Sequence, residues 1–360
     1  MPFVRYLKTL AGSMDSSAAL DEADAHDLFA AMLDGGVPDL ELGALLAALW
    51  MRGETAAHLM GFRRALASRT FPMEPLEEGL RPVVLPAYGG AREWPNLLPL
   101  LAMLLQRLNV PVLVHGTLEG GGRVAAAYVL RELGVMPCAS VRAAREALHA
   151  DHLAFVPTGV LSPGLAQVLA LKNRLGMRSM GHLAAKLLDP FGDAVLVVGA
   201  SSAARRERLA ETLLAGGGNA LLLASCEGEP VCHPLHRPAI DWITDATRVR
   251  LFEAERGPDK PVPGLPAAVD AAATASWIRR GLAGDALLPH PLVNQFACCL
   301  HATGYAADMN QAKAIAVVEA GGRASTTSLR PGPGGSADYG GVLAGAGRGG
   351  AAVCRPRGVG

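Results

Sequence analysis

Apolar positions recur every three to four residues in the first fifth of the chain. One such stretch covers residues 22–32 and stops at Gly35 and Gly36, a second covers 42–50, and a third covers 56–66. This spacing places the apolar side chains on one face of a helix, where they can be buried together. The segment from Leu20 to about Arg69 is therefore predicted to form a small all-helical unit.

Beyond a proline-bearing connector at residues 72–82, short apolar runs alternate with helical segments. The five candidate strands are residues 82–85, 110–114, 153–156, 194–198 and 220–224. Strands separated by helices are typical of a parallel sheet covered on both faces. The predicted fold class is α/β, with a small all-helical domain and a larger α/β domain built on a mainly parallel central sheet.

The first two candidate strands are each followed by a glycine turn and a helix. The turns are Gly89-Gly90 and Gly120-Gly121-Gly122. A glycine turn that opens a helix lets backbone N–H groups approach a phosphate, and the helix dipole favours the negative charge. These turns predict an anion-binding surface, and they leave open whether a reaction takes place on it.

The composition is that of a large globular chain without net charge. Half of the 360 residues are apolar, and 33 Lys and Arg balance 33 Asp and Glu, so any nucleic-acid surface must be local. No apolar run reaches the ~18 residues of a membrane span, and no signal peptide is recognisable. Six cysteines at irregular positions do not form a disulfide framework. We therefore expect a cytoplasmic protein without a membrane partner.

Positive charge is concentrated in one segment, residues 160–188, which contains no Asp or Glu. Its four cations are Lys172, Arg174, Arg178 and Lys186. Ser179 is expected to cap a helix on which His182 and Lys186, four positions apart, share a face. A cationic face of this kind can contact phosphates, and Arg123, directly after the second glycine turn, would extend it. The alternative is a set of solvated surface charges.

Other candidate sites are weaker. Cys226, Cys232, His233 and His236 could be offered as a zinc set, but their spacing is irregular and no Cys-x-x-Cys pair accompanies them, so no metal site is predicted. Aromatic residues make up only 5% of the chain, and none lies among the cations of the basic segment. Base stacking is therefore not expected from the sequence.

Several motifs occur in an order that is typical of one family. They are LGALLAALWMRGET at 42–55, the first glycine turn, VHG, VLRELG, FVPTG, ALKNRLGMRSMGHLAAKLLDPFG at 170–192, VLVVGAS and LVNQFACCLHATG at 292–304. In that order the chain resembles the anthranilate phosphoribosyltransferase family, which is related to the pyrimidine nucleoside phosphorylases. The resemblance covers about residues 20–322.

This resemblance implies a specific domain organisation. Residues 1–75 would form the helical domain, joined by about 160–188, and residues 76–159 and 189–322 would form the α/β domain. The active cleft would lie between the two, and a homodimer would form through the helical domain. Residues 323–360 are rich in glycine and proline, lie outside the resemblance and are predicted to be disordered.

The chain departs from the motifs with which these enzymes bind phosphoribosyl pyrophosphate. The GTGGD turn is replaced by AYGGA at 87–91, the KHGN loop by VHGT at 114–117, and the magnesium-binding Asp-Glu pair by CEGEP at 226–230. The serine of the following family helix is also missing, and Lys172 and His182 replace an arginine and an asparagine. The positions that keep the substrate-loop pattern are Gly89, Gly90, Asn96, His115 and Gly116.

The lost groups are those that would neutralise a diphosphate leaving group, so no catalytic residue and no cofactor are predicted. The HLAAKLLDPF version of the motif resembles the YbiB-type branch of the family, whose members bind nucleic acid. The resemblance implies sequence-nonspecific binding of nucleic acid, DNA in particular, through phosphate contacts. The predicted contact residues are Lys172, Arg174, Arg178, His182, Lys186 and Arg123.

Two other functions remain open at this stage. The first is a pentosyltransferase that holds phosphoribosyl pyrophosphate with the degenerate substrate loop, and in that case Mg²⁺ would be required. Isolated Glu227 or Glu229 and the substrate itself would then have to hold the metal. The second is a dimeric protein that binds a nucleotide metabolite.

Overall fold

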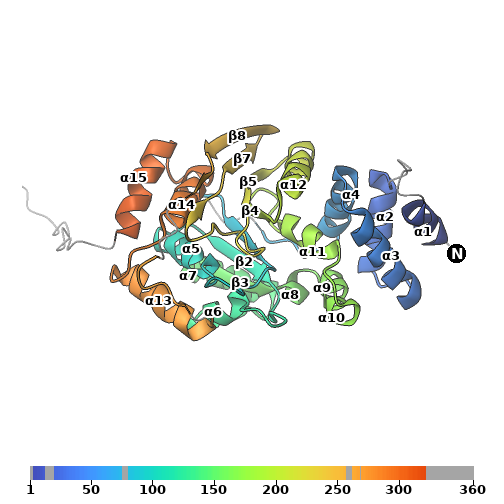
Figure 1. Cartoon of the computed structure of the whole chain (residues 1–360), viewed down its shortest axis with the longest axis horizontal. Coiled ribbons are helices and arrows are strands. Elements are labelled where there is room, and N and C mark those ends of the chain that lie inside the picture. The colour runs from blue at the N-terminus through green and yellow to red at the C-terminus, as the bar shows by residue number, and fades with distance from the viewer. Residues whose placement is uncertain (1–2, 13–19, 75–79, 257–261, 268, 322–360) are drawn as a thin grey trace, which may run out of the picture. The chain divides into compact units, whose positions relative to one another are not determined.

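The computed structural model describes residues 3–12, 20–74, 80–256, 262–267 and 269–321. Within these ranges the chain forms a helical lobe and a larger α/β lobe, which confirms the predicted fold class (Figure 1). The predicted disorder of residues 323–360 concerns a segment outside the described residues.

The helical lobe is formed by two separate parts of the chain. The N-terminal part is α1 (Phe3–Ala11), α2 (Glu22–Leu33), α3 (Asp39–Arg52) and α4 (Ala56–Ala67). The later part is α8 (Thr158–Leu161), α9 (Pro163–Ala170), α10 (Lys172–Leu175) and α11 (Gly181–Ala184), followed by a 3₁₀ turn at Ala185–Leu187. Helices α9 and α11 pack against α2 and α4, so the basic segment lies where the two lobes meet.

Packing between α2 and α4 organises the helical lobe. The rings of Phe29 and Phe62 are fully buried with their centroids 4.6 Å apart. Gly61 allows the two helices to approach closely, because a Cβ atom there would lie 2.4 Å from the carbonyl oxygen of Glu22. Burial of each of these two aromatic side chains stabilises the lobe by ~2 kcal/mol.

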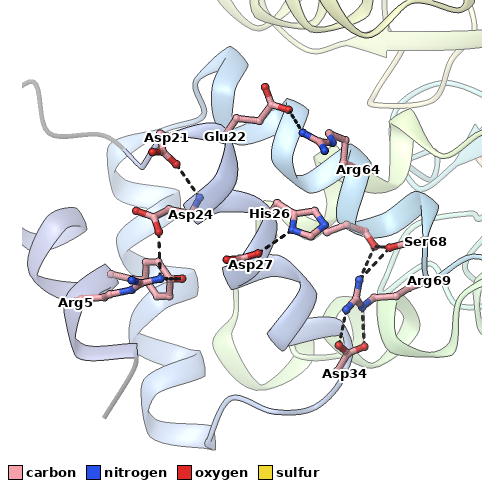
Figure 2. Close-up of polar contacts among 12 residues, drawn as sticks. Arg5, Asp21, Glu22, Asp24, His26, Asp27, Asp34, Arg64, Ser68 and Arg69 are labelled. Carbon is pink, nitrogen blue, oxygen red and sulfur yellow. Dashed lines mark hydrogen bonds and ion pairs between the residues drawn. The ribbon is translucent and has the colours of Figure 1, made fainter.

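Capping and ion pairs on the lobe's surface fix the ends of these helices (Figure 2). The carboxylate of Asp21 accepts a hydrogen bond from the N–H of Asp24 at 2.8 Å and so caps α2. Across the lobe, Arg69 forms a two-point pair with the carboxylate of Asp34, at 2.7 and 2.6 Å. These contacts connect the end of α4 to the end of α2.

All five predicted strands are present and parallel. They are β1 (Val83–Ala87), β2 (Val112–Gly116), β3 (Leu153–Pro157), β4 (Val195–Ala200) and β5 (Asn219–Ala224). The sheet has the strand order β3-β2-β1-β4-β5-β7-β8, and its last two strands, β7 (Ile240–Thr244) and β8 (Thr247–Phe252), are antiparallel. This hairpin is an addition to the five strands expected from the sequence. Asp245 and Ala246 make its turn with φ angles of 49° and 56°.

Helices cover both faces of the sheet, as expected for parallel strands (Figure 1). The helices of the α/β lobe are α5 (Leu98–Arg107), α6 (Ala126–Glu132), α7 (Val141–Asp151), α12 (Ala203–Gly216), α13 (Ala271–Ala283), α14 (His290–Ala302) and α15 (Met309–Ala320). One face of the sheet contributes to a core shared with the helical lobe, and the other packs on α5, α6, α13 and α14. A short two-stranded ribbon, β6 (His236–Arg237) with β9 (Glu255–Arg256), completes the described strands.

The two glycine turns are adjacent in space because β1 and β2 are parallel neighbours. Both turns follow the carboxyl ends of these strands, and the backbones of Ala91 and Val124 bond to each other at 2.9 and 2.8 Å. The fold therefore brings both predicted anion-binding turns to one edge of the sheet, beside the helical lobe.

Candidate functional site

A cavity of about 730 Å³, here called the groove, opens between the two lobes. The helical lobe contributes Trp50, Gly53 and Glu54 from the end of α3, while the start of α12 contributes Ser201, Arg205 and Arg208. The remaining wall is formed by Arg92, Glu93, Arg123, the segment from Arg178 to Lys186, and the turn at Ser225, Glu227 and Gly228. The groove therefore contains groups from both lobes and from both glycine-turn regions.

Two of the groove's arginines share one carboxylate. Glu54, buried at the end of α3, accepts from Arg205 at 2.6 Å and from Arg208 at 3.2 Å. Burial raises the pKa of Glu54, but the hydrogen bonds from these arginines outweigh it and bring the pKa below its usual range. This triad connects α3 to α12, and its single carboxylate compensates one of the two arginine charges.

The remaining cations of the groove lack such a partner. No carboxylate of the described residues lies within 4.0 Å of Arg92, Arg123, Arg178 or Lys186. Arg178 donates to the carbonyl oxygen of Gly89 at 2.7 Å, and Arg123 donates to that of Gly90 at 3.3 Å. Burial and then repulsion from Arg123 lower the pKa of Arg178, although Glu229 acts in the opposite direction.

A smaller pocket of about 260 Å³ lies between these arginines and the second glycine turn. It is lined by Gly120, Gly121, Arg123, Lys172, Gly176, Met177 and Arg178, and no carboxylate is among them. Gly121 and Gly122 have φ angles of 56° and 82°, a conformation that side chains rarely adopt. Lys172 and Arg178 of the basic segment and Arg123 of the second glycine turn thus converge on one pocket.

Lys186 belongs to the groove but is almost fully buried. Its Nζ donates to the carbonyl oxygen of Gly199 at 2.9 Å. Burial lowers the pKa of Lys186 to about 8, and the carboxylate of Glu229 partly opposes this change. The amine therefore changes charge close to neutral pH.

His182 is buried beside Lys186 and is neutral at pH 7. Burial, followed by the charges of Arg178 and Lys172, lowers the pKa of His182 to about 4. Ser179 does not cap a helix as predicted: α11 is only four residues long and begins after Met180, without a side-chain cap. The Ser179 hydroxyl instead lies 3.5 Å from Nδ1 of His182. The basic segment is too irregular here to present one long helical face.

Arg174 is separated from the other cations of its segment. It lies on α10 and pairs with Asp39 of α3 at 3.1 Å, and it lines neither the groove nor the smaller pocket. The structure therefore brings Lys172, Arg178, His182, Lys186 and Arg123 together and leaves Arg174 outside.

The first glycine turn is contacted by two carboxylates of the chain itself. Glu229 is fully buried, and its Oε1 accepts from the N–H of Gly90 at 2.6 Å and from the side-chain amide of Asn96 at 3.3 Å. Glu227 accepts from the backbone N–H groups of Arg92, Glu93 and Trp94 at 3.0, 2.8 and 3.3 Å. The donors that would face an external anion at this turn are already hydrogen-bonded.

His115 and Gly116 serve the sheet rather than the groove. The His115 ring is fully buried, with Nδ1 2.9 Å from the phenol of Tyr88 and Nε2 3.2 Å from the carbonyl oxygen of Leu188. Burial lowers the pKa of His115 to about 4. Gly116 has no room for a side chain, because a Cβ atom would lie 2.1 Å from the carbonyl oxygen of Ala87. The His115 ring is thus a buried hydrogen-bonding group within the core.

The carboxylates present do not fit a resident magnesium site. Mg²⁺ requires six oxygen ligands in near-octahedral geometry. Both oxygens of Glu227 and Oε1 of Glu229 accept hydrogen bonds, and the groove that Glu227 lines also contains Arg92, Arg123 and Arg178, whose charges oppose a bound cation. Within the described residues no three His, Cys, Asp or Glu side chains are grouped so as to hold a metal ion.

A second cavity of about 380 Å³ adjoins the groove at His182. Its walls include Gly116, Thr117, Pro157 and Thr158 from the ends of β2 and β3, and Lys172 and Asn173 from the basic segment. Apolar side chains such as Leu118 and Leu169 complete it. This cavity can accommodate a small, partly apolar molecule next to the cationic pocket.

Several residues of the groove, Trp50 and Glu54 among them, could not be predicted from the sequence. Trp50 is 56% exposed and lies at the rim among the groove's cations, which sequence spacing could not reveal because it comes from a different lobe. Glu227 and Glu229 were considered only as metal ligands. Their proximity to a turn 135 residues earlier depends on the pairing of β1 with β4 and of β4 with β5.

The sequence of this chain is similar to those of several known proteins. Residues 5–70 match the family described as the glycosyl transferase family, helical bundle domain. The chain is 37% identical over 312 residues to the uncharacterized protein YbiB of Escherichia coli (strain K12), covering 86% of this chain and 97% of YbiB. It is 28% identical over 251 residues to the anthranilate phosphoribosyltransferase of Geobacillus thermodenitrificans, covering 70% of each.

The fold is also shared with solved structures. The anthranilate phosphoribosyltransferase of Saccharomyces cerevisiae, solved in complex with PRPP and Mg, is similar with a TM-score of 0.67 and 13% identity, covering 89% of this chain and 93% of that one. No helix of the described residues is long and apolar enough to cross a membrane. These similarities match the helical lobe and the parallel sheet on which the groove is built.

Proposed function

The chain belongs to the anthranilate phosphoribosyltransferase-like family that includes YbiB, and from this premise we propose that it binds nucleic acid through the groove and does not transfer phosphoribosyl groups. The observation that supports this most is the convergence of Lys172, Arg123 and Arg178 on a pocket without a carboxylate. Cations that lack an internal partner favour an external anion.

The chemistry of the groove favours a polyanion over a single metal-bound diphosphate. Its free cations extend from the smaller pocket to Arg92 and Lys186, whereas the first glycine turn is occupied by Glu227 and Glu229. A phosphodiester backbone places successive single charges along such a surface, and contacts of this kind give affinity without sequence preference. DNA is the nucleic acid we propose, in agreement with the expectation from the sequence.

The assembly and location that we propose follow the same family expectation. A homodimer formed through the helical lobe would present two grooves to one polyanion, which increases overall affinity through effective concentration. We also propose a cytoplasmic location.

Titration of a fluorescent oligonucleotide tests this function. Binding is expected at low salt, with the logarithm of the affinity falling linearly as the logarithm of salt concentration rises. Absence of binding to both single- and double-stranded oligonucleotides at low salt would refute it. Arg123→Ala and Lys172→Ala should each weaken binding uniformly across sequences.

Pentosyl transfer is the second candidate, and one observation favours it. The cavity at Thr117, Pro157 and Thr158 adjoins the cationic pocket, so an acceptor molecule could lie beside a bound phosphate. The similar yeast enzyme is solved with PRPP and Mg, so Mg²⁺ is the cofactor that this second function would require. Calorimetry with phosphoribosyl pyrophosphate and Mg²⁺ separates the two, because metal-dependent saturable binding is expected only for the transferase.

A further inference from the structure

The carboxylate of Glu227 binds the backbone in the way an external anion would. Its Oε2 accepts from the N–H groups of Arg92 and Trp94 at 3.0 and 3.3 Å, and its Oε1 accepts from that of Glu93 at 2.8 Å. Successive backbone N–H groups that converge on one anion form a typical binding concavity for phosphate oxygens. Here the chain supplies the anion itself.

Glu229 occupies the neighbouring donors of the same turn. Its Oε1 accepts from the N–H of Gly90 and from Nδ2 of Asn96, while Oε2 is buried without a hydrogen-bond partner in the described residues. Burial raises the pKa of this carboxyl, although the N–H of Gly90 and then the charge of Lys186 oppose that effect. The two carboxylates together accept from four backbone N–H groups of residues 90–94 and from the side-chain amide of Asn96.

Close packing of the backbone keeps these carboxylates in place. At Gly89 a Cβ atom would lie 2.5 Å from the carbonyl carbon of Gly228 and 2.6 Å from the nitrogen of Glu229. Gly90 and Gly228 both have positive φ angles, 70° and 94°, so the two loops meet at residues without side chains. The contact between the loops is thus built on glycine at both sides.

We propose that Glu227 and Glu229 are specificity-determining residues that exclude diphosphates from the first glycine turn. A diphosphate bound there would have to displace the carboxylates from their donors and would leave the charge of Glu229 buried without hydrogen bonds, which is costly. Anionic ligands are thereby restricted to the pocket of Lys172, Arg123 and Arg178, which suits isolated phosphate charges. The inference does not depend on whether the ligand of that pocket is nucleic acid.

Binding of inorganic pyrophosphate in the absence of metal tests this proposal. Isothermal titration calorimetry of the wild-type chain should give only weak pyrophosphate binding, at the pocket of Lys172, Arg123 and Arg178, which Lys172→Ala reduces further. Glu227→Ala frees the three N–H groups of Arg92, Glu93 and Trp94 and should increase the affinity at least about ten-fold, consistent with the ~1.4 kcal/mol of one charge-assisted hydrogen bond.

Glu93→Gln is the matched control. Glu93 lines the same groove and carries the same charge, but no backbone N–H of the described residues donates to its carboxylate. It should therefore increase pyrophosphate affinity much less than Glu227→Ala does. Equal gains in the two variants would mean that only the net charge of the groove matters, and would overturn the proposal, as would tight wild-type binding that Lys172→Ala leaves unchanged.

A second variant keeps the test valid if the loop is disturbed. Thermal unfolding establishes whether Glu227→Ala remains folded, and Glu227→Gly, which also removes the carboxylate and suits the φ angle of 52° at this position, replaces it if the alanine variant does not. Failure of every folded Glu227 variant to gain affinity would refute the inference. Oligonucleotide titration of the same variants reports separately on the proposed nucleic-acid function, so failure of one proposal is distinguishable from failure of the other.

Discussion

The phenolic oxygen of Tyr88 lies 2.9 Å from Nδ1 of His115, inside a core that excludes water. With the Tyr88 hydroxyl as donor to Nδ1, the other ring nitrogen donates to the carbonyl oxygen of Leu188. Both nitrogens are then satisfied in the neutral ring, and burial holds the pKa of His115 at about 4. His115, which the family pattern places in the substrate loop, therefore stabilises the fold.

This relationship predicts a loss of stability in mild acid. The unfolded chain protonates His115 near pH 6.5, whereas the folded chain does so only near pH 4, so the stabilisation is complete above 6.5 and is lost as the pH falls toward 4. The expected loss at pH 5 is about 2 kcal/mol. Urea unfolding at pH 7 and pH 5 should show a smaller pH-dependent loss in His115→Asn than in the wild type. Identical losses in the two proteins would contradict it.

Arg178 and Arg174 should differ in their importance for nucleic-acid binding. Arg178 lines the pocket without a carboxylate, whereas Arg174 pairs with Asp39 outside the groove. Arg178→Ala is expected to weaken oligonucleotide binding by roughly ten-fold, as for one charge-assisted contact, and to reduce the salt slope by about one. Arg174→Ala, the control from the same segment, should change neither. Salt-dependent titrations of both variants provide the measurement, and equal effects would argue against the groove as the site.

Lys186 should make oligonucleotide affinity depend on alkaline pH. Its pKa of about 8, lowered by burial, means that the amine is mainly charged at pH 7 and mainly neutral at pH 9. The wild-type affinity is therefore expected to fall several-fold between these values, since one cation of the groove is lost. Lys186→Arg, which stays charged, and Lys186→Met, which is never charged, should both bind with little pH dependence. A wild-type affinity that is constant from pH 7 to 9 would exclude this role.

Trp50 should favour single strands over duplexes. Its side chain is exposed at the rim of the groove, where an unstacked base can pack on the indole. Trp50→Ala is expected to weaken single-stranded binding by about 1–3 kcal/mol and to leave duplex binding nearly unchanged. Met51→Ala, an exposed neighbour that does not line the groove, serves as the control. An equal loss for single strands and duplexes would mean that Trp50 does not stack on bases.

The fold could be predicted from the sequence more completely than the site, because buried strands leave a recognisable hydrophobic pattern. The five parallel strands are continuous apolar runs because both faces of the sheet are buried, and such runs are visible in sequence. The β7–β8 hairpin could not be predicted because Arg248 and Arg250 alternate with Val249 and Leu251 on a partly exposed edge strand. Edge strands carry a weaker hydrophobic signal.

The arrangement of the site residues depends on contacts between distant segments, and the spacing of residues in the sequence does not reveal those contacts. Lys172 and Arg178 were correctly placed in one basic segment, yet their convergence with Arg123 follows from strand order. Nothing in the spacing indicated that Arg174 would turn toward Asp39 instead. The occupation of the first glycine turn by Glu227 likewise required the pairing of strands far apart in the chain.

The three hydrogen bonds from residues 92–94 to Glu227 also affect the conformational entropy change on ligand binding. Loops that line a binding surface usually lose conformational entropy when a ligand orders them. Because Glu227 already orders this wall, an arriving polyanion would not incur that entropic penalty there. Complex formation should accordingly behave as near rigid-body association, with a rate set by electrostatic steering rather than by loop rearrangement.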